Sequence, residues 1–373
     1  MTYLTDRDVR RLTTAAVLDV YPYLDRQEEN FQGRPLAELL TLLPAEGSKE
    51  YLAFRGTLEA ALAQNPSLGE LLLIDQSVLA GFSAKHVNAC TFWDPASAIY
   101  ICYRGTGDGK WVDNGEAYTR ASSFMQRKAE EYFDSVAERY DLAHFPGETV
   151  ISGHSKGGNN AQFVAFDSPY APLIDACCSF DGQGLSDAAT AMFREKYGAA
   201  EYETQLAKMT AVNGSNDPVN RLVVPRIPDA QTYLLDIPLE TIADTHSLRS
   251  MLRGDQLLWS TDAAGRITHG EPGPIWRFVD EVSKQVALQP LKVQDDCAMG
   301  LMSLIELLEK GKLGTGDRKI ASPLEWIGFF TQGAPLLLRD LLHTKEGKAA
   351  LTAALQSAAL SLLRPGQPAA AFR

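Results

Sequence analysis

The spacing of apolar residues changes twice along the chain, near residue 70 and near residue 290. Before residue 70 the spacing is helical, and Asp6 is a start signal for the first helix. A second helical pattern covers 51–63, and prolines punctuate the segments between. The apolar positions of the first helix are Val9, Leu12, Ala16 and Leu18. Residues 1–70 are therefore predicted to form a helical N-terminal extension.

Between residues 71 and 289 short apolar runs alternate with helical patterns. The segments 83–94 and 98–105 are rich in β-branched and aromatic residues and predict a hairpin or two adjacent strands. Helices are then expected at about 117–140, 159–169 and 185–197, and strands at 147–154, 176–182, 208–214 and 232–237. Strands that alternate with helices predict a mostly parallel central sheet covered by helices on both faces. This is the predicted core.

From residue 290 to 373 the pattern is helical, rich in Leu and Ala, and has no strand candidates. An amphipathic pattern of this kind predicts a helical C-terminal extension packed on the core, and a lid over an active site is the alternative.

Composition and charge narrow the class of protein. With 45% hydrophobic and 22% charged residues, the 373-residue chain is typical of folded globular proteins. A net charge of -12 without any basic run argues against a nucleic-acid partner. No apolar run approaches the length that spans a bilayer, and the first 20 residues lack the pattern of a secretory signal. Five cysteines without CxxC spacing favour a reducing compartment, so a cytoplasmic location is expected.

A candidate nucleophile lies in the sequence GHSKG at 153–157. This matches G-x-S-x-G, in which a serine occupies a sharp turn between a strand and a helix. Val150 and Ile151 supply the strand, and the two flanking glycines let the strand and helix approach closely. The pentapeptide alone is a weak signal, but its position between a predicted strand and a predicted helix makes Ser155 the candidate nucleophile.

A serine nucleophile needs a histidine base and a carboxylate that orients it. In α/β-hydrolases the order along the chain is serine, acid, histidine, which favours histidines after Ser155. His246 follows the strand at 232–237 and is preferred, with His269 in reserve; His154 adjoins the serine and is expected to point away. For the acid, Asp217 follows the strand at 208–214, and the alternatives are Asp236 and Asp244.

An oxyanion hole requires donors aimed at the developing negative charge. The backbone N–H of Lys156 is one candidate, because this residue follows the nucleophile. The loop YRGTGDG at 103–109 offers the second: Gly105 permits close approach and Thr106 carries a hydroxyl. A simple glycine turn is the alternative reading of this loop.

The segments YRGT, GHSKGG, NDPV and THSL together resemble the lipase-like α/β-hydrolases of the class 3 type, and most closely a bacterial family of lipase-like proteins. The resemblance covers about residues 75–255 and implies Ser155 as nucleophile, Asp217 as acid, His246 as base, and Thr106 and Lys156 as oxyanion donors. Two positions depart from the pattern: Lys156 replaces a common Leu, which is expected to change the charge near the mouth of the site, and Tyr103 replaces Phe. The sequence WVDN at 111–114 is expected to support the YRGT loop.

The sequence thus predicts an α/β-hydrolase fold and a serine hydrolase that cleaves a carboxylic ester, with a lipid or other acyl ester as substrate. No metal or organic cofactor is expected, because motifs such as HExxH are absent. Two alternatives remain: an inactive hydrolase fold that serves as a binding module, and a thioesterase or peptidase that uses the same triad.

Overall fold

The computed structural model describes residues 4–24, 31–77, 87–94, 97–106, 111–223, 225–237 and 245–288, together with 290–292, 294–295 and 297–298. The C-terminal extension predicted at 290–373 lies almost entirely outside the described residues.

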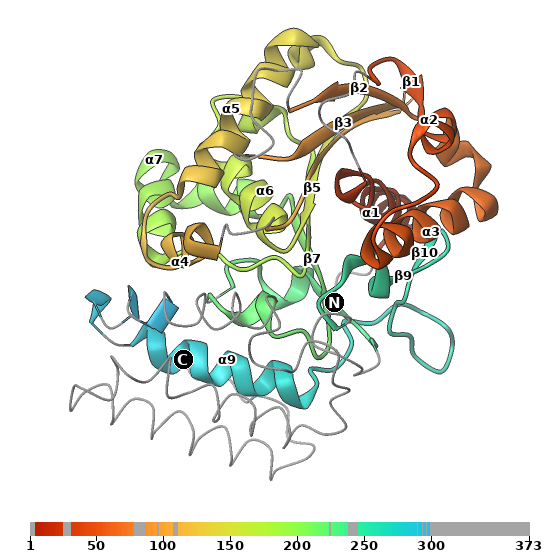
Figure 1. Ribbon diagram of the computed structural model, residues 1–373. Coiled ribbons are helices and arrows are strands. Elements are labelled where there is room, and N and C mark those ends of the chain that lie inside the picture. The colour runs from red at the N-terminus through yellow and green to blue at the C-terminus, as the bar shows by residue number, and fades with distance from the viewer. Residues whose placement is uncertain are drawn as a thin grey trace.

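One eight-stranded sheet, with its strands in sequence order, organises the described part of the chain (Figure 1). The first four strands pair in antiparallel fashion, and β4 to β8 are all parallel. The predicted mostly parallel sheet of an α/β-hydrolase fold is confirmed. The strands are β1 (Arg34–Pro35), β2 (Leu72–Gln76), β3 (Ala89–Asp94), β4 (Ala98–Tyr103), β5 (Glu148–His154), β6 (Ala176–Phe180), β7 (Met209–Gly214) and β8 (Thr232–Leu235).

Helices cover both faces of this sheet (Figure 1). One face packs against α1 (Asp6–Leu18), α2 (Leu36–Leu42) and α3 (Lys49–Gln64). The other packs against α5 (Phe124–Arg139), α6 (Lys156–Asp167) and α7 (Asp187–Leu206). Three further elements are α4 (Trp111–Thr119), α9 (Pro274–Ala287) and a small hairpin of β9 (Leu252–Arg253) and β10 (Gln256–Leu257).

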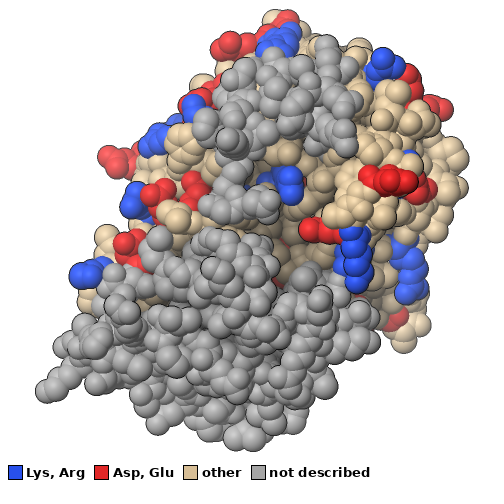
Figure 2. Space-filling view, viewed as in Figure 1, with Lys and Arg blue, Asp and Glu red and all other residues tan. Residues whose placement is uncertain are grey.

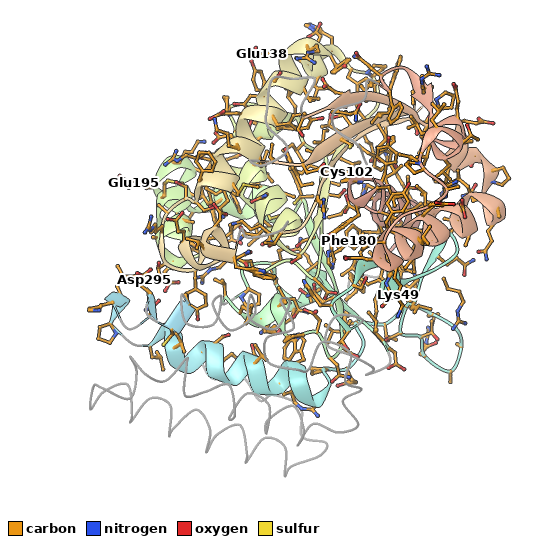
Figure 3. The ribbon with its side chains drawn as sticks, in the orientation of Figure 1. Lys49, Cys102, Glu138, Phe180, Glu195 and Asp295 are labelled. Atoms are coloured by element: carbon orange, nitrogen blue, oxygen red, sulfur yellow. The ribbon has the colours of Figure 1, made fainter. Side chains whose placement is uncertain are left out.

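Alternating side chains of the central strands supply the two halves of the core. In β4, Tyr100 and Cys102 belong to the cluster on the α1 side, whereas Ile99 and Ile101 belong to the cluster on the α5 side. This is the two-residue period of a strand buried on both faces. Figure 3 shows Cys102 and Phe180 in the middle of the molecule and Glu138 and Glu195 at its periphery.

Three elements differ from the sequence-based expectation. The N-terminal region contributes not only helices but also β1, which pairs with β2 at the edge of the sheet. The short apolar run LLLI at 71–74, for which the sequence predicts no strand, supplies three of the five residues of β2. The helix expected at 117–140 is two helices, because the Ser123 hydroxyl and the Gln126 side chain form a capping box that starts α5 afresh.

The described surface carries charges of both signs. In Figure 2 Lys and Arg side chains stand near Asp and Glu side chains, without a broad patch of one sign in this view. None of the described helices combines the length and the apolar character needed to cross a bilayer.

Candidate active site

The candidate nucleophile occupies a sharp turn between β5 and α6. Strand β5 ends at His154 and α6 begins at Lys156, so Ser155 alone makes the turn. Its φ of 58° and ψ of -123° lie in a region that residues other than glycine rarely adopt. Such strain typically persists where the surrounding structure enforces it, often at functional sites.

The two glycines that flank the turn are required by close contacts. A Cβ atom on Gly153 would lie 2.3 Å from the backbone of Gly157, and one on Gly157 would lie 2.0 Å from the carbonyl oxygen of Tyr103. Any larger residue at either position would push β5, α6 and β4 apart. The G-x-S-x-G pattern therefore reflects the packing of three backbones around Ser155.

The structure brings Ser155, His246 and Asp217 into one hydrogen-bonded row, here called the triad. Ser155 Oγ lies 2.8 Å from His246 Nε2, and His246 Nδ1 lies 2.6 Å from Asp217 Oδ2. The three residues follow β5, β7 and β8, so parallel strands deliver them to the same edge of the sheet.

The carboxylate of Asp217 is fully buried and fixed by hydrogen bonds. Its Oδ1 accepts from the backbone N–H groups of Val219 and Asn220, at 2.8 and 2.9 Å, and from Asn220 Nδ2 at 3.1 Å. These donors leave Oδ2 directed at His246. The carboxylate thus has one orientation, which in turn sets the orientation of the imidazole.

The alternative base predicted from the sequence, and the alternative acid that lies within the described residues, do not take part in this hydrogen-bonded row. The ring of His269 is bonded to the Thr232 carbonyl at 2.8 Å and stacks on Tyr233. Asp236 is exposed to solvent, and Asp244 lies outside the described residues.

His154 lies beside His246, with ring centroids 4.8 Å apart, but makes different bonds. Its Nε2 is 2.8 Å from the His246 carbonyl oxygen and its Nδ1 is 2.8 Å from the Tyr23 hydroxyl. Because a carbonyl only accepts, we assign the proton to Nε2, and Tyr23 then donates to Nδ1. Burial, and after it the neighbouring His246, hold the pKa of His154 well below its usual range, in keeping with a neutral ring.

Tyr23 extends this chain of bonds to the predicted oxyanion loop. Its hydroxyl accepts the backbone N–H of Gly105 at 3.2 Å, and burial raises the pKa of Tyr23 to about 12, so it stays protonated. A Cβ atom on Gly105 would lie 2.7 Å from that hydroxyl, which explains the glycine. The backbones of Gly105 and His246 are therefore connected through Tyr23 and His154.

Of the two predicted oxyanion donors, Lys156 directly follows Ser155, and Thr106 follows Gly105, on which an added Cβ atom would lie 3.2 Å from Ser155 Cβ. Lys156 is the first residue of α6, where a backbone N–H has no partner within the helix. Thr106 Oγ1 accepts a hydrogen bond from Asn114 Nδ2 at 2.8 Å. Because the oxygen of Thr106 is used as an acceptor there, its own proton is available for another acceptor.

The side chain of Lys156 contradicts the expectation that it changes the charge at the mouth of the site. It is 3% exposed, and its Nζ lies 2.9 Å from Asp113 Oδ2, 2.9 Å from Asn159 Oδ1 and 3.1 Å from Ser123 Oγ. Burial lowers the pKa of Lys156, and the Asp113 carboxylate opposes that shift. The charge is internal because the first turn of α6 packs against α4, which carries Asp113.

Three potential metal ligands also meet at the site. Within the described part of the chain, one ligand atom each from His154, Asp181 and His246 lies within 4.8 Å of the other two. Both ring nitrogens of each histidine already take part in the hydrogen bonds described above. A metal ion would have to displace at least one of those bonds from each ring.

Sequence reasoning missed several of these residues. Tyr23 comes from the N-terminal helical region and has no local signal. Asp181 follows β6 in the segment SFDG, a position at a strand end that could have drawn attention. Asp113 and Asn114 belong to the WVDN segment, for which the sequence predicts only structural support of the YRGT loop.

Comparison with known proteins relates part of the chain to a family. The model of the family described as Mbeg1-like matches residues 73–212, a span that contains Thr106, Ser155 and Lys156 but ends before Asp217. No curated protein matches the chain.

Among solved structures, a fungal lipase–inhibitor complex matches with a TM-score of 0.39 and 14% identity, over 59% of this chain and 76% of that chain. The Rhizomucor miehei lipase propeptide complex matches with a TM-score of 0.36 and 12% identity, over 60% and 67%. Lip2 lipase from Yarrowia lipolytica matches with a TM-score of 0.35 and 16% identity, over 64% and 82%.

Proposed function

We propose that this protein is a serine hydrolase that cleaves carboxylic esters, with an acyl lipid or related ester as substrate. The observation that carries the proposal is the triad at the strained turn, with distances of 2.8 Å from Ser155 to His246 and 2.6 Å from His246 to Asp217. Nucleophile, base and orienting acid are each within hydrogen-bond reach of the next, as acyl transfer by a serine requires.

In the first half of the reaction, Ser155 Oγ attacks the acyl carbon while His246 Nε2 takes its proton. Asp217 accepts the Nδ1–H bond and stabilises the imidazolium that forms. His246 then donates its proton to the leaving alcohol, and the acyl group stays on Ser155. In the second half, His246 takes a proton from water as the water oxygen attacks the acyl carbon; the bond from that carbon to Ser155 Oγ then breaks, His246 returns the proton to Oγ, and the acid is released.

The tetrahedral intermediates carry a negative oxygen that needs donors. We assign the backbone N–H of Lys156 and the hydroxyl of Thr106 to this role. The start of α6 adds the positive end of a helix dipole at the same place. The bond from Asn114 to Thr106 supports the assignment, because it leaves the Thr106 proton free to turn toward the substrate.

Hydrolysis of a p-nitrophenyl ester series of increasing acyl length tests this function. The wild-type protein is expected to turn over at least part of the series, and Ser155→Ala is expected to lower kcat/KM by about 10⁴-fold or more. The preferred acyl length would then define the substrate class.

Two results would contradict the proposal. Equal turnover by wild type and Ser155→Ala would place the activity elsewhere. An absence of turnover on every ester, with no reaction of Ser155 with a fluorophosphonate, would favour the binding-module alternative.

A further inference from the structure

A second buried carboxylate lies next to the triad and has no part in the mechanism above. Asp181 directly follows β6, one strand before the strand that leads to Asp217, and its side chain is fully buried. Its φ of 47° lies in the left-handed region, which is uncommon outside glycine. The backbone N–H of Asp181 bonds to the Val212 carbonyl at 3.1 Å and holds the residue against β7.

Within the described part of the chain, hydrogen bonds reach one of the two carboxylate oxygens of Asp181. Oδ1 accepts from the Gly214 backbone N–H at 2.7 Å and from Asn220 Nδ2 at 3.0 Å. Oδ2 is buried and has no hydrogen-bond partner among the described residues. An unsatisfied buried carboxylate oxygen is costly, so its retention calls for a reason.

The two carboxylates are closely linked. The same Asn220 Nδ2 that bonds to Asp181 also bonds to Asp217 Oδ1 at 3.1 Å, so one amide bridges them. Burial first, and then the charge of Asp217, raise the pKa of Asp181 well above its usual range, while His246 opposes the shift. Both causes favour the protonated form of Asp181.

We propose that Asp181 is a second acid of this site, able to orient His246 and to stabilise its imidazolium form when Asp217 is absent. The inference rests on the proposed function. It follows from the placement of a carboxylate oxygen of Asp181 within 4.8 Å of a His246 ring nitrogen and from the unsatisfied Oδ2. Removal of Asp217 takes away the second of the two causes that raise the pKa of Asp181 and leaves the opposing effect of His246, so Asp181 loses its proton more easily beside the same ring.

A metal ion held by His154, Asp181 and His246 is the competing explanation of the same cluster. The hydrogen bonds to both nitrogens of each ring favour the second-acid role. The two explanations differ in their response to chelators, which the experiment below uses.

The test compares the rate at which a fluorophosphonate labels Ser155 in wild type, Asp217→Ala, Asp181→Ala and the double variant. Asp217→Ala is expected to be slowed by about 10²-fold, less than the roughly 10⁴-fold typical of losing a triad acid. The double variant should be at least about tenfold slower than Asp217→Ala, whereas Asp181→Ala alone should be slowed by less than about threefold. A purely packing role for Asp181 would give additive losses instead.

Asp217→Asn provides a contrast that preserves the side-chain volume. Its amide would donate to His246 Nδ1 and favour the wrong tautomer, so labelling should be slower than in Asp217→Ala. Thermal unfolding shows whether each variant is folded. If Asp217→Ala is not folded, Asp217→Asn replaces it, and the labelling rate of Asp217→Asn is compared with that of Asp217→Asn combined with Asp181→Ala.

The outcomes separate the two proposals. If wild type is not labelled faster than Ser155→Ala, both the proposed function and this inference are wrong. If wild type is labelled but the double variant matches the single Asp217 variant, only the second acid is refuted. A labelling rate that falls with EDTA and recovers with zinc would assign the cluster to a metal ion instead.

Discussion

Two groups of side chains meet around Ser155 and differ in what they contact. The triad consists of Ser155, His246 and Asp217, whose bonds run from one reactive group to the next. The supporting network is defined here as Tyr23, His154, Asn114, Asp113 and Lys156. Its bonds end on backbone atoms, on Thr106, on members of the network itself, or, for Lys156, also on the side chains of Ser123 and Asn159.

The difference between the triad and the supporting network is clearest in two neighbouring histidines, His246 and His154. His246 has a serine on one nitrogen and a carboxylate on the other, so it can take a proton and be stabilised when charged. His154 has a tyrosine hydroxyl and a carbonyl, so it is confined to one neutral tautomer. The hydrogen-bond partners of a histidine therefore decide whether it can serve as a base, and its distance from the nucleophile along the sequence does not.

Replacing the base should have the largest effect and should sharpen the comparison. His246→Ala is expected to lower kcat/KM for ester hydrolysis by about 10⁴-fold or more, because Ser155 loses its proton acceptor. His144→Ala is the matched control, since His144 is exposed and bonded only to the nearby Asp141 in the contacts described, and it should behave as wild type. A His246→Ala variant that retains activity would contradict the account, because His246 would then not be the base that distinguishes the triad from the supporting network.

The supporting network should instead affect stability most. Lys156→Met leaves Asp113 buried without its cation and is expected to lower the free energy of unfolding by about 3–5 kcal/mol. Urea unfolding measures this loss. Lys156→Met combined with Asp113→Asn should recover at least half of it, because the uncompensated charge is then removed; equal instability of the single and double variants would contradict the ion-pair account.

Thr106 connects the supporting network to the proposed chemistry, because it accepts a hydrogen bond from Asn114 and is a proposed oxyanion donor. Thr106→Val, which keeps the shape and removes the hydroxyl, is expected to lower kcat by about 10²–10³-fold with little change in KM. Thr106→Ser retains the hydroxyl and should restore most of the rate. A loss confined to KM, or a failure of serine to restore the rate, would show that Thr106 contributes to binding or packing and not to the oxyanion hole.

The smallest expected effect concerns pH and His154. Because burial depresses its pKa in the folded state, the unfolded chain binds a proton below about pH 6.5 that the folded protein does not. This contribution to stability is complete above that pH and is lost as the pH falls, by up to about 1.4 kcal/mol per pH unit.

His154→Gln removes this titration. The free energy of unfolding of wild type should therefore fall more steeply than that of His154→Gln between about pH 7 and about pH 5, as measured in urea. Parallel profiles for the two proteins would mean that His154 is not held neutral by its surroundings.

Local patterns were sufficient to predict much of the sheet. The strands β3 to β5 are rich in β-branched and aromatic residues, β6 to β8 are short apolar runs between helical patterns, and the turn at Ser155 is marked by two glycines that leave no room for a Cβ atom. The edge strands were harder. β1 has only two residues, and the LLLI run of β2 is too short for its period to distinguish a strand from a buried helix.

The triad was easier to predict from the sequence than the supporting network. The order of serine, acid and histidine along parallel strands led to Ser155, Asp217 and His246, and the structure places these three side by side; their catalytic roles stay predictions. The supporting network depends on long-range contacts. Tyr23 lies 131 positions before His154, and the direction of the Lys156 side chain depends on how α4 packs against α6.

The most direct test of the central claim is the intact mass of the protein after reaction with a fluorophosphonate, followed by peptide mapping. The account predicts a single adduct on Ser155 that is absent from Ser155→Ala and strongly slowed in His246→Ala. No adduct, or an adduct on another residue, would mean that the row of Ser155, His246 and Asp217 does not activate the serine.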